Sequence, residues 1–238
     1  MRSEKPLAGK VALITGASRG IGLAIAHRLA ALGASLGLTA RDRNRLDAVA
    51  RELQSGTKVF TSTADLAKSD ETASLVPKTE QALGPIDILI NNAGVGTFAA
   101  IQDASEADWD KMLDTNLKAV FLLTKAVAPG MIRRKTGHIV NIASLAGKNA
   151  FPGGALYCAS KWGLLGLTQC AAEDLRAHGI RVSAICPGSV ATDFSPHGKK
   201  DPSKMLQADD VAHATEMILL QEPQSFISEI SLRPTQKP

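Results

Sequence analysis

The sequence has few residues that could crosslink the chain or bind a metal. Among its 238 residues are three cysteines, Cys158, Cys170 and Cys186, an odd number in apolar surroundings and without metal-ligand spacing. The five histidines also lack such spacing. Small secreted domains are rich in paired cysteines, whereas cytosolic proteins keep their thiols reduced. We therefore expect a reduced, cytoplasmic setting and no bound metal.

Long apolar runs and runs of one charge are also missing. No apolar segment approaches the about 18 residues that a membrane-spanning helix needs, and "MRSEKPLAGK" at the N-terminus has no apolar signal core. The net charge is +4, but lysine and arginine are scattered along the chain. We expect neither a membrane nor a nucleic-acid partner, and a modest positive charge suits a small anionic ligand at least as well.

Aromatic residues make up only 4% of the chain, and Tyr157 is its one tyrosine. It lies in "ALYCASKWG" (155–163), four positions before Lys161, so on a helix the two side chains share a face. Such a pair can simply pack, with the phenol filling a gap and the lysine reaching water. It can also serve chemistry, and the spacing alone leaves both interpretations open.

Short apolar runs alternate with longer segments of helical periodicity. Nearly continuous apolar runs, typical of parallel strands covered on both faces, predict strands at 11–15, 35–39, 58–62, 86–90, 138–142 and 180–186, with a short one near 226–232. Helices are predicted at 20–32, 43–54, 69–83, 105–134 (as two helices), 153–177 and 208–220. This alternation predicts an α/β fold, a doubly wound parallel sheet with helices on both faces. No linker, repeat or low-complexity segment interrupts it, so we expect one domain over 1–238.

The predicted helix at 153–177 is apolar or small almost all the way round. A helix at the surface of a monomer would show a polar stripe. One face can pack on the sheet and the other on a second subunit. We therefore expect a homodimer or homotetramer formed through the helices near 105–134 and 153–177.

A glycine-rich turn, "TGASRGIG" (15–22), joins the first strand to the first helix. Gly16, Gly20 and Gly22 have the spacing G-x3-G-x-G. Glycine lets the backbone approach a pyrophosphate closely, and the amides at the helix start face the anion. A glycine turn without any ligand is the alternative that this motif alone leaves open.

The end of the second predicted strand indicates which dinucleotide such a turn would hold. A site that selects a free ribose 2′-hydroxyl needs a carboxylate there, but this chain has Ala40 followed by Arg41. Arginine offers a planar fork for a phosphate, and Arg19 could reach the same place. We predict NADP(H) as the cofactor, in preference to NAD(H). Asp42 could instead bind a ribose or cap the next helix.

Four features follow one another along the chain: the glycine turn, "NNAG" (91–94), Ser144 and the pair of Tyr157 and Lys161. Through them the chain resembles the short-chain dehydrogenase/reductase family, of the compact type with a Rossmann-type fold, over roughly residues 7 to 195. The resemblance implies that the cofactor phosphates contact Gly16, Ser18, Arg19, Gly20, Ile21 and Gly22. It places Asp65 at the adenine with Leu66 beside it. The segment after the fourth strand, which would support the sheet and line the adenosine ribose, contains Asn91, Ala93 and Gly94. The nicotinamide amide would meet Pro187, Gly188, Val190 and Thr192, and the catalytic tetrad would be Asn116, Ser144, Tyr157 and Lys161.

The implied reaction explains why these residue types are needed. Carbonyl reduction delivers a hydride to carbon and a proton to oxygen, and a tyrosine with a pKa near 10 is a poor base for the reverse step. We expect the charge of Lys161, with the oxidised nicotinamide, to favour the phenolate, and a pKa lowered by about 3 units corresponds to about 4 kcal/mol. Lys161 would also bind the nicotinamide ribose and Ser144 the substrate oxygen. Asn116 would anchor a water, unless it is only a satisfied buried amide.

The expected activity is therefore an NADP(H)-dependent oxidoreductase acting on a small carbonyl or secondary alcohol, with Tyr157 as proton donor and acceptor. Segments 95–101 and 145–155 and a short substrate lid near 193–206 would select the substrate. One alternative is a 3-oxoacyl-carrier-protein reductase, although "FISEISLRPTQKP" lacks the glycine-pair ending usual in those reductases. The other is a low-turnover sensor or scaffold that binds NADP(H).

Overall fold

The computed structural model describes residues 5–194 and 201–238. Its strands are β1 (Val11–Thr15), β2 (Ser35–Ala40), β3 (Val59–Thr63), β4 (Ile88–Asn91), β5 (Gly137–Ile142), β6 (Ile180–Pro187) and β7 (Glu229–Leu232). The α-helices are α1 (Gly20–Ala31), α2 (Arg43–Leu53), α3 (Ser69–Leu83), α4 (Glu106–Leu113), α5 (Ala119–Arg134), α6 (Ala155–Arg176) and α7 (Ala208–Leu219). The predicted strands and helices are all present, with ends that differ by a few residues.

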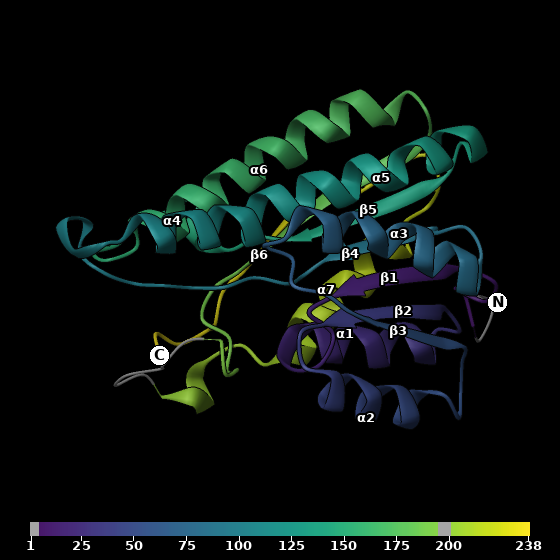
Figure 1. Cartoon of the computed structure of the whole chain (residues 1–238), viewed down its shortest axis with the longest axis horizontal. Coiled ribbons are helices and arrows are strands. Elements are labelled where there is room, and N and C mark those ends of the chain that lie inside the picture. The colour runs from purple at the N-terminus through teal and green to yellow at the C-terminus, as the bar shows by residue number, and fades with distance from the viewer. Residues whose placement is uncertain (1–4, 195–200) are drawn as a thin grey trace.

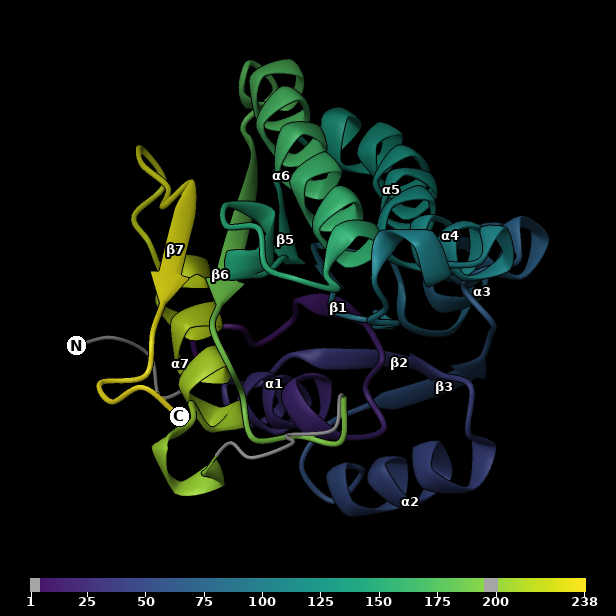
Figure 2. The same ribbon diagram turned by 90° about the vertical axis from the view of Figure 1, so that its left-hand side faces the viewer.

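All seven strands pair in parallel, in the order β3-β2-β1-β4-β5-β6-β7. Helices α1, α2 and α7 cover one face, and α3, α5 and α6 cover the other, as Figures 1 and 2 show. The predicted doubly wound, single-domain fold is therefore confirmed. The continuous apolar runs follow from this arrangement, since a parallel strand between two helical layers is buried on both sides.

The predicted 105–134 helical segment is interrupted by a short π-helical turn, η2 (Asp114–Lys118), between α4 and α5. Such turns insert an extra residue into the helix, and they occur frequently at functional sites. Here the turn contains Asn116, whose side chain is buried. Hydrophobic periodicity alone does not indicate this insertion.

A chain of buried amides connects the central strands to α6. The Asn91 Nδ2 atom of β4 donates to Oδ1 of Asn141 on β5 at 2.8 Å, and Asn141 Nδ2 donates to the Thr168 hydroxyl of α6 at 2.9 Å. Buried polar side chains are stable only when they are paired, so this chain favours one placement of α6. That placement matters because α6 carries Tyr157 and Lys161.

The lid predicted near 193–206 falls partly on 195–200, outside the described residues. Its second half is anchored, because Leu206 N–H donates to the Ser189 carbonyl at 3.0 Å and Ala191 N–H donates to the Leu206 carbonyl at 2.8 Å. In the part of the chain that the structure describes, no helix is long and apolar enough to cross a membrane.

Candidate active site

A cleft of about 1410 Å³ opens at the carboxyl ends of the strands. The strand order reverses between β1 and β4, so the connections on either side of this point leave in opposite directions and a crevice remains. Segments that follow β1 to β6 line the cleft, together with Met205 and the C-terminal residues from Arg233 to Pro238.

The glycine turn forms one end of the cleft. Gly16 and Gly20 have φ angles of 66° and 54°, in the left-handed region that favours glycine. A Cβ on Gly22 would overlap the Gly16 carbonyl oxygen and lie 2.5 Å from Nδ2 of Asn92. No side chain caps the start of helix α1, so no capping side chain accepts a hydrogen bond from its first backbone N–H groups. This bare, closely packed helix start fits the pyrophosphate of a dinucleotide.

Asn92 holds this turn against the segment that follows β4. Its Nδ2 donates to the carbonyls of Thr15 at 2.9 Å and Gly16 at 3.2 Å. The Thr15 hydroxyl in turn accepts from the backbone N–H groups of Asn92 and Ala93, each at 3.0 Å. Asn92 belongs to the "NNAG" motif, and its positioning role was not predicted.

Arg41 and Arg19 both line the cleft beyond the end of β2. Asp42 caps α2, since its carboxylate accepts the Arg45 backbone N–H at 3.1 Å and lies 3.4 Å from Nε of the same residue. Asp42 therefore caps the helix, and it also lines the cleft. The Arg19 guanidinium lies 3.5 Å from the carboxylate of Asp193, which also lines the cleft.

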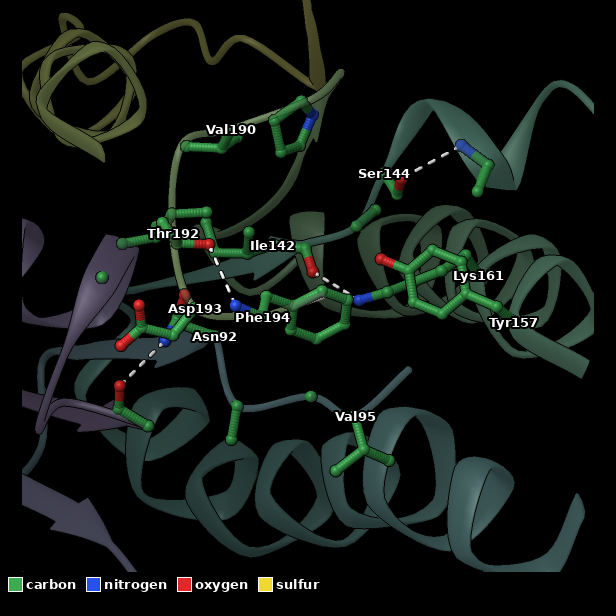
Figure 3. Close-up of a pocket in the computed structure, with 18 of the residues that line it drawn as sticks. Asn92, Val95, Ile142, Ser144, Tyr157, Lys161, Val190, Thr192, Asp193 and Phe194 are labelled. Carbon is green, nitrogen blue, oxygen red and sulfur yellow. Dashed lines mark hydrogen bonds between the residues drawn. The ribbon is translucent and has the colours of Figure 1, made fainter. Parts of the chain in front are cut away.

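Tyr157, Lys161 and Ser144 meet at the other end of the cleft (Figure 3). Tyr157 and Lys161 lie one turn apart on α6, and Ser144 follows β5, where its hydroxyl accepts the Ala146 N–H at 3.1 Å. Lys161 is 4% exposed, and its Nζ donates to the Ile142 carbonyl at 3.0 Å. The ammonium is thus fixed 5.8 Å from the centroid of the tyrosine ring.

Burial dominates the electrostatics of this pair. It raises the pKa of Tyr157 to about 12, and a hydrogen bond from Ser144 lowers it by a smaller amount. Burial also lowers the pKa of Lys161 to about 8. The sequence predicts that Lys161, together with the oxidised nicotinamide, favours the phenolate. With the protein groups alone, the phenol stays protonated throughout the neutral range. Desolvation is the reason, because it penalises the charged form of either side chain.

Asn116 is a fully paired buried amide. Its Oδ1 accepts the Val95 N–H at 2.8 Å, and its Nδ2 donates to the Val95 carbonyl at 2.9 Å and the Ser160 hydroxyl at 3.1 Å. The side chain therefore supports the loop after β4. A Cβ on Gly94 in this loop would lie 3.2 Å from Asn116 Oδ1 and 3.9 Å from Lys161 Nζ, so both side chains adjoin this glycine.

The other predicted cofactor residues also line the cleft: Ser18, Ile21, Asp65, Leu66, Ala93, Gly94, Pro187, Gly188, Val190 and Thr192. Gly22, Asn91 and Asn116 do not, and all three are buried. Val95 belongs to the predicted substrate segment 95–101, whereas Lys111, Thr115 and the C-terminal segment with Arg233, Pro234 and 236–238 were not predicted to line the cleft. The pairing of β7 with β6 brings that segment to the cleft.

The chain matches one family model and is similar to several oxidoreductases. The family model named short chain dehydrogenase matches residues 10–202. An uncharacterized oxidoreductase of Staphylococcus saprophyticus is 38% identical over 96% of this chain and 98% of its own. A 3-oxoacyl-(acyl-carrier-protein) reductase of Staphylococcus epidermidis is 39% identical over 78% of this chain and 77% of its own. The crystal structure of a metagenomic short-chain oxidoreductase in complex with NADP is 47% identical, with a TM-score of 0.86 over 97% of this chain and 99% of that one.

Proposed function

This chain belongs to the short chain dehydrogenase family, and we propose that it is an NADP(H)-dependent oxidoreductase that interconverts a carbonyl compound and a secondary alcohol. One observation carries this proposal. The glycine turn, Arg41 and the group of Ser144, Tyr157 and Lys161 come from distant parts of the chain and line the same cleft.

The two ends of the cleft suit two different parts of the cofactor. The amides at the start of α1 would hold the pyrophosphate, and Arg19 and Arg41 would hold a 2′-phosphate. The loop after β6, with Pro187, Gly188 and Thr192, would receive the nicotinamide end. When bound, NADPH supplies the hydride.

Tyr157 then supplies the proton. Its phenol is protonated at neutral pH, which is the state that carbonyl reduction needs from a donor. Ser144, which donates a hydrogen bond to the same hydroxyl, would share the substrate oxygen with it and fix its position. The nearby Lys161 ammonium stabilises the negative charge left on the tyrosine oxygen after proton transfer. In the absence of the cofactor, these protein groups hold Tyr157 in the protonation state from which reduction starts.

Replacing Arg41 by alanine is expected to raise KM for NADPH about 10- to 100-fold and to leave KM for NADH nearly unchanged, because a charged hydrogen bond to a phosphate contributes about 1.5–3 kcal/mol. Steady-state kinetics with both cofactors measure this. Arg43→Ala is the matched control, since Arg43 is exposed on α2 and does not line the cleft. An unchanged ratio of NADPH to NADH in the Arg41 variant would refute the assignment.

The activity itself is tested by following NADPH absorbance against simple ketones, diketones and 3-oxoacyl thioesters. Turnover of ketones or diketones supports the proposal. A strong preference for acyl-carrier-protein thioesters would identify a 3-oxoacyl-carrier-protein reductase, the activity of the Staphylococcus epidermidis relative. Tight NADPH binding without turnover of any carbonyl would leave the sensor or scaffold interpretation.

We also propose a homodimer or homotetramer that associates through α4, α5 and α6. Large apolar side chains on these helices are exposed, with Trp109 43%, Phe121 44% and Trp162 55% accessible. Exposed apolar side chains gathered on neighbouring helices are typical of subunit contacts. Light scattering at micromolar concentration should give at least twice the 25.0 kDa mass of one chain, and a strictly monomeric mass would reject the interface.

We make two further proposals, one on the cellular compartment and one on the substrate lid. We place the protein in the cytoplasm because Cys158, Cys170 and Cys186 are all free thiols. We also propose that the segment near 193–206 is a lid that covers the substrate. Of its described residues, Asp193, Phe194 and Met205 line the cleft.

A further inference from the structure

We propose that Phe98, Phe151 and Phe194 form an aromatic recess beside Tyr157 that binds an aryl group on the substrate carbonyl carbon. This inference rests on the proposed function and narrows its substrate class. It assigns the three phenylalanines as specificity-determining residues.

The first observation is where the aromatic side chains lie. The chain has six phenylalanines and one tyrosine, and three of the phenylalanines gather around that tyrosine. The Phe98 and Phe194 ring centroids lie 5.5 Å and 5.8 Å from that of Tyr157, and Phe151 lies 6.0 Å from Phe98. Figure 3 shows the Phe194 ring next to the Tyr157 ring. These separations are within the range of favourable ring pairs.

The second observation is that the rings face the cleft and do not belong to the core. Phe98, Phe151 and Phe194 are 42%, 43% and 40% exposed, and all three line the cleft. An apolar surface left open beside polar reacting groups gains free energy when a ligand covers it. A flat aryl group can stack on these ring faces, whereas a slim acyl chain covers less of them.

The backbone around the recess leaves space for the rings. A Cβ on Gly96 would lie 3.0 Å from both the Phe98 Cζ and Phe194 Cε1 atoms, so the two rings converge over this glycine. The Ala99 N–H donates to the Gly153 carbonyl at 3.1 Å, which joins the loop of Phe98 to the loop of Phe151. The recess is therefore formed by loops after β4, β5 and β6 that already contact one another.

The charges of the cleft favour a neutral aryl group over a cationic one. Aromatic cages also bind quaternary ammonium groups. The side-chain carboxylates among the described lining residues are Asp42, Asp65 and Asp193. Asp193 directly precedes Phe194, but its carboxylate lies 3.5 Å from the Arg19 guanidinium, which offsets its charge. Close to the recess is the Lys161 ammonium, which would repel a second cation.

The test compares two diketones that differ only in one substituent, 1-phenyl-1,2-propanedione and 2,3-butanedione. With NADPH, the wild-type enzyme is expected to prefer the phenyl compound in kcat/KM by at least about tenfold, since aromatic pairs add to the burial of apolar area. Phe98→Ala and Phe194→Ala should each reduce that preference about tenfold, measured as the ratio of kcat/KM for the two diketones, because a loss common to both substrates cancels in the ratio.

Met217→Ala is the control, because Met217 is 47% exposed on α7 and does not line the cleft. Phe98→Leu keeps an apolar side chain without a ring, and it replaces the alanine variant if that variant fails to fold. If the enzyme is active but does not favour the phenyl compound, or prefers betaine aldehyde or a 3-oxoacyl thioester, the proposal of an aryl-binding recess is wrong and the proposed function stands. If NADPH binds but no carbonyl is reduced, the proposed function fails and the recess with it.

Discussion

Replacing Tyr157 by phenylalanine is expected to lower the turnover of NADPH with any carbonyl substrate by about 10²- to 10⁴-fold, the usual contribution of a positioned proton donor. The phenol is the proton donor in our proposal, and its pKa of about 12 keeps it protonated at neutral pH. The variant removes only the hydroxyl, and Phe98 and Phe194 retain their ring contacts to the new side chain. We therefore expect an unchanged fold.

Two measurements separate loss of chemistry from loss of binding. NADPH affinity, measured by fluorescence titration, should stay within about fivefold of the wild-type value, because a single neutral hydroxyl contributes about 1 kcal/mol or less to binding. Thr57→Val is a matched control that removes a hydroxyl remote from the cleft, where Thr57 donates to the Ala34 carbonyl at 2.6 Å. Turnover above a tenth of the wild-type rate in Tyr157→Phe would show that another group donates the proton.

Replacing Lys161 by methionine is expected to lower turnover by about 10²-fold or more and at the same time to stabilise the fold. Burial lowers the pKa of this lysine from 10.5 to about 8, so the folded state destabilises the ammonium by about 3 kcal/mol at neutral pH. Methionine removes that cost but leaves the Ile142 carbonyl without its donor, a loss of about 1 kcal/mol. The free energy of unfolding should therefore rise by about 1–3 kcal/mol at pH 7.

The pH dependence gives this prediction a second readout. Between the folded pKa of about 8 and the unfolded value of 10.5, the unfolded chain binds more protons at this site, so wild-type stability rises with pH in that window. Lys161→Met should lack that rise, and the wild-type reductase activity should fall as pH increases through about 8 because the ammonium is lost. Urea unfolding at several pH values measures the first effect, and Lys78→Met, at an exposed position on α3, is the control. A less stable Lys161→Met at pH 7 would contradict the argument.

The two interpretations considered for Asn116 show that a sequence motif can identify a residue without determining its contacts. Its position in the chain matched the family tetrad, but its contacts are to the Val95 backbone and Ser160. Asn116 lies in a π-helical turn, and its partners Val95 and Ser160 are 21 and 44 positions away in the chain. The sequence pattern therefore identified the residue and left its role open.

The amino-acid sequence by itself determined the alternation of strands and helices, the glycine turn and the shared face of Tyr157 and Lys161. Each of these depends on local periodicity or on backbone freedom, which a short stretch of chain contains in full. Only the tertiary structure decided the pKa directions of that pair, the aromatic recess of Phe98, Phe151 and Phe194, and the place of the C-terminal segment at the cleft. Burial and contacts between loops that follow different strands arise only when the sheet is assembled, so no single stretch of the sequence contains them.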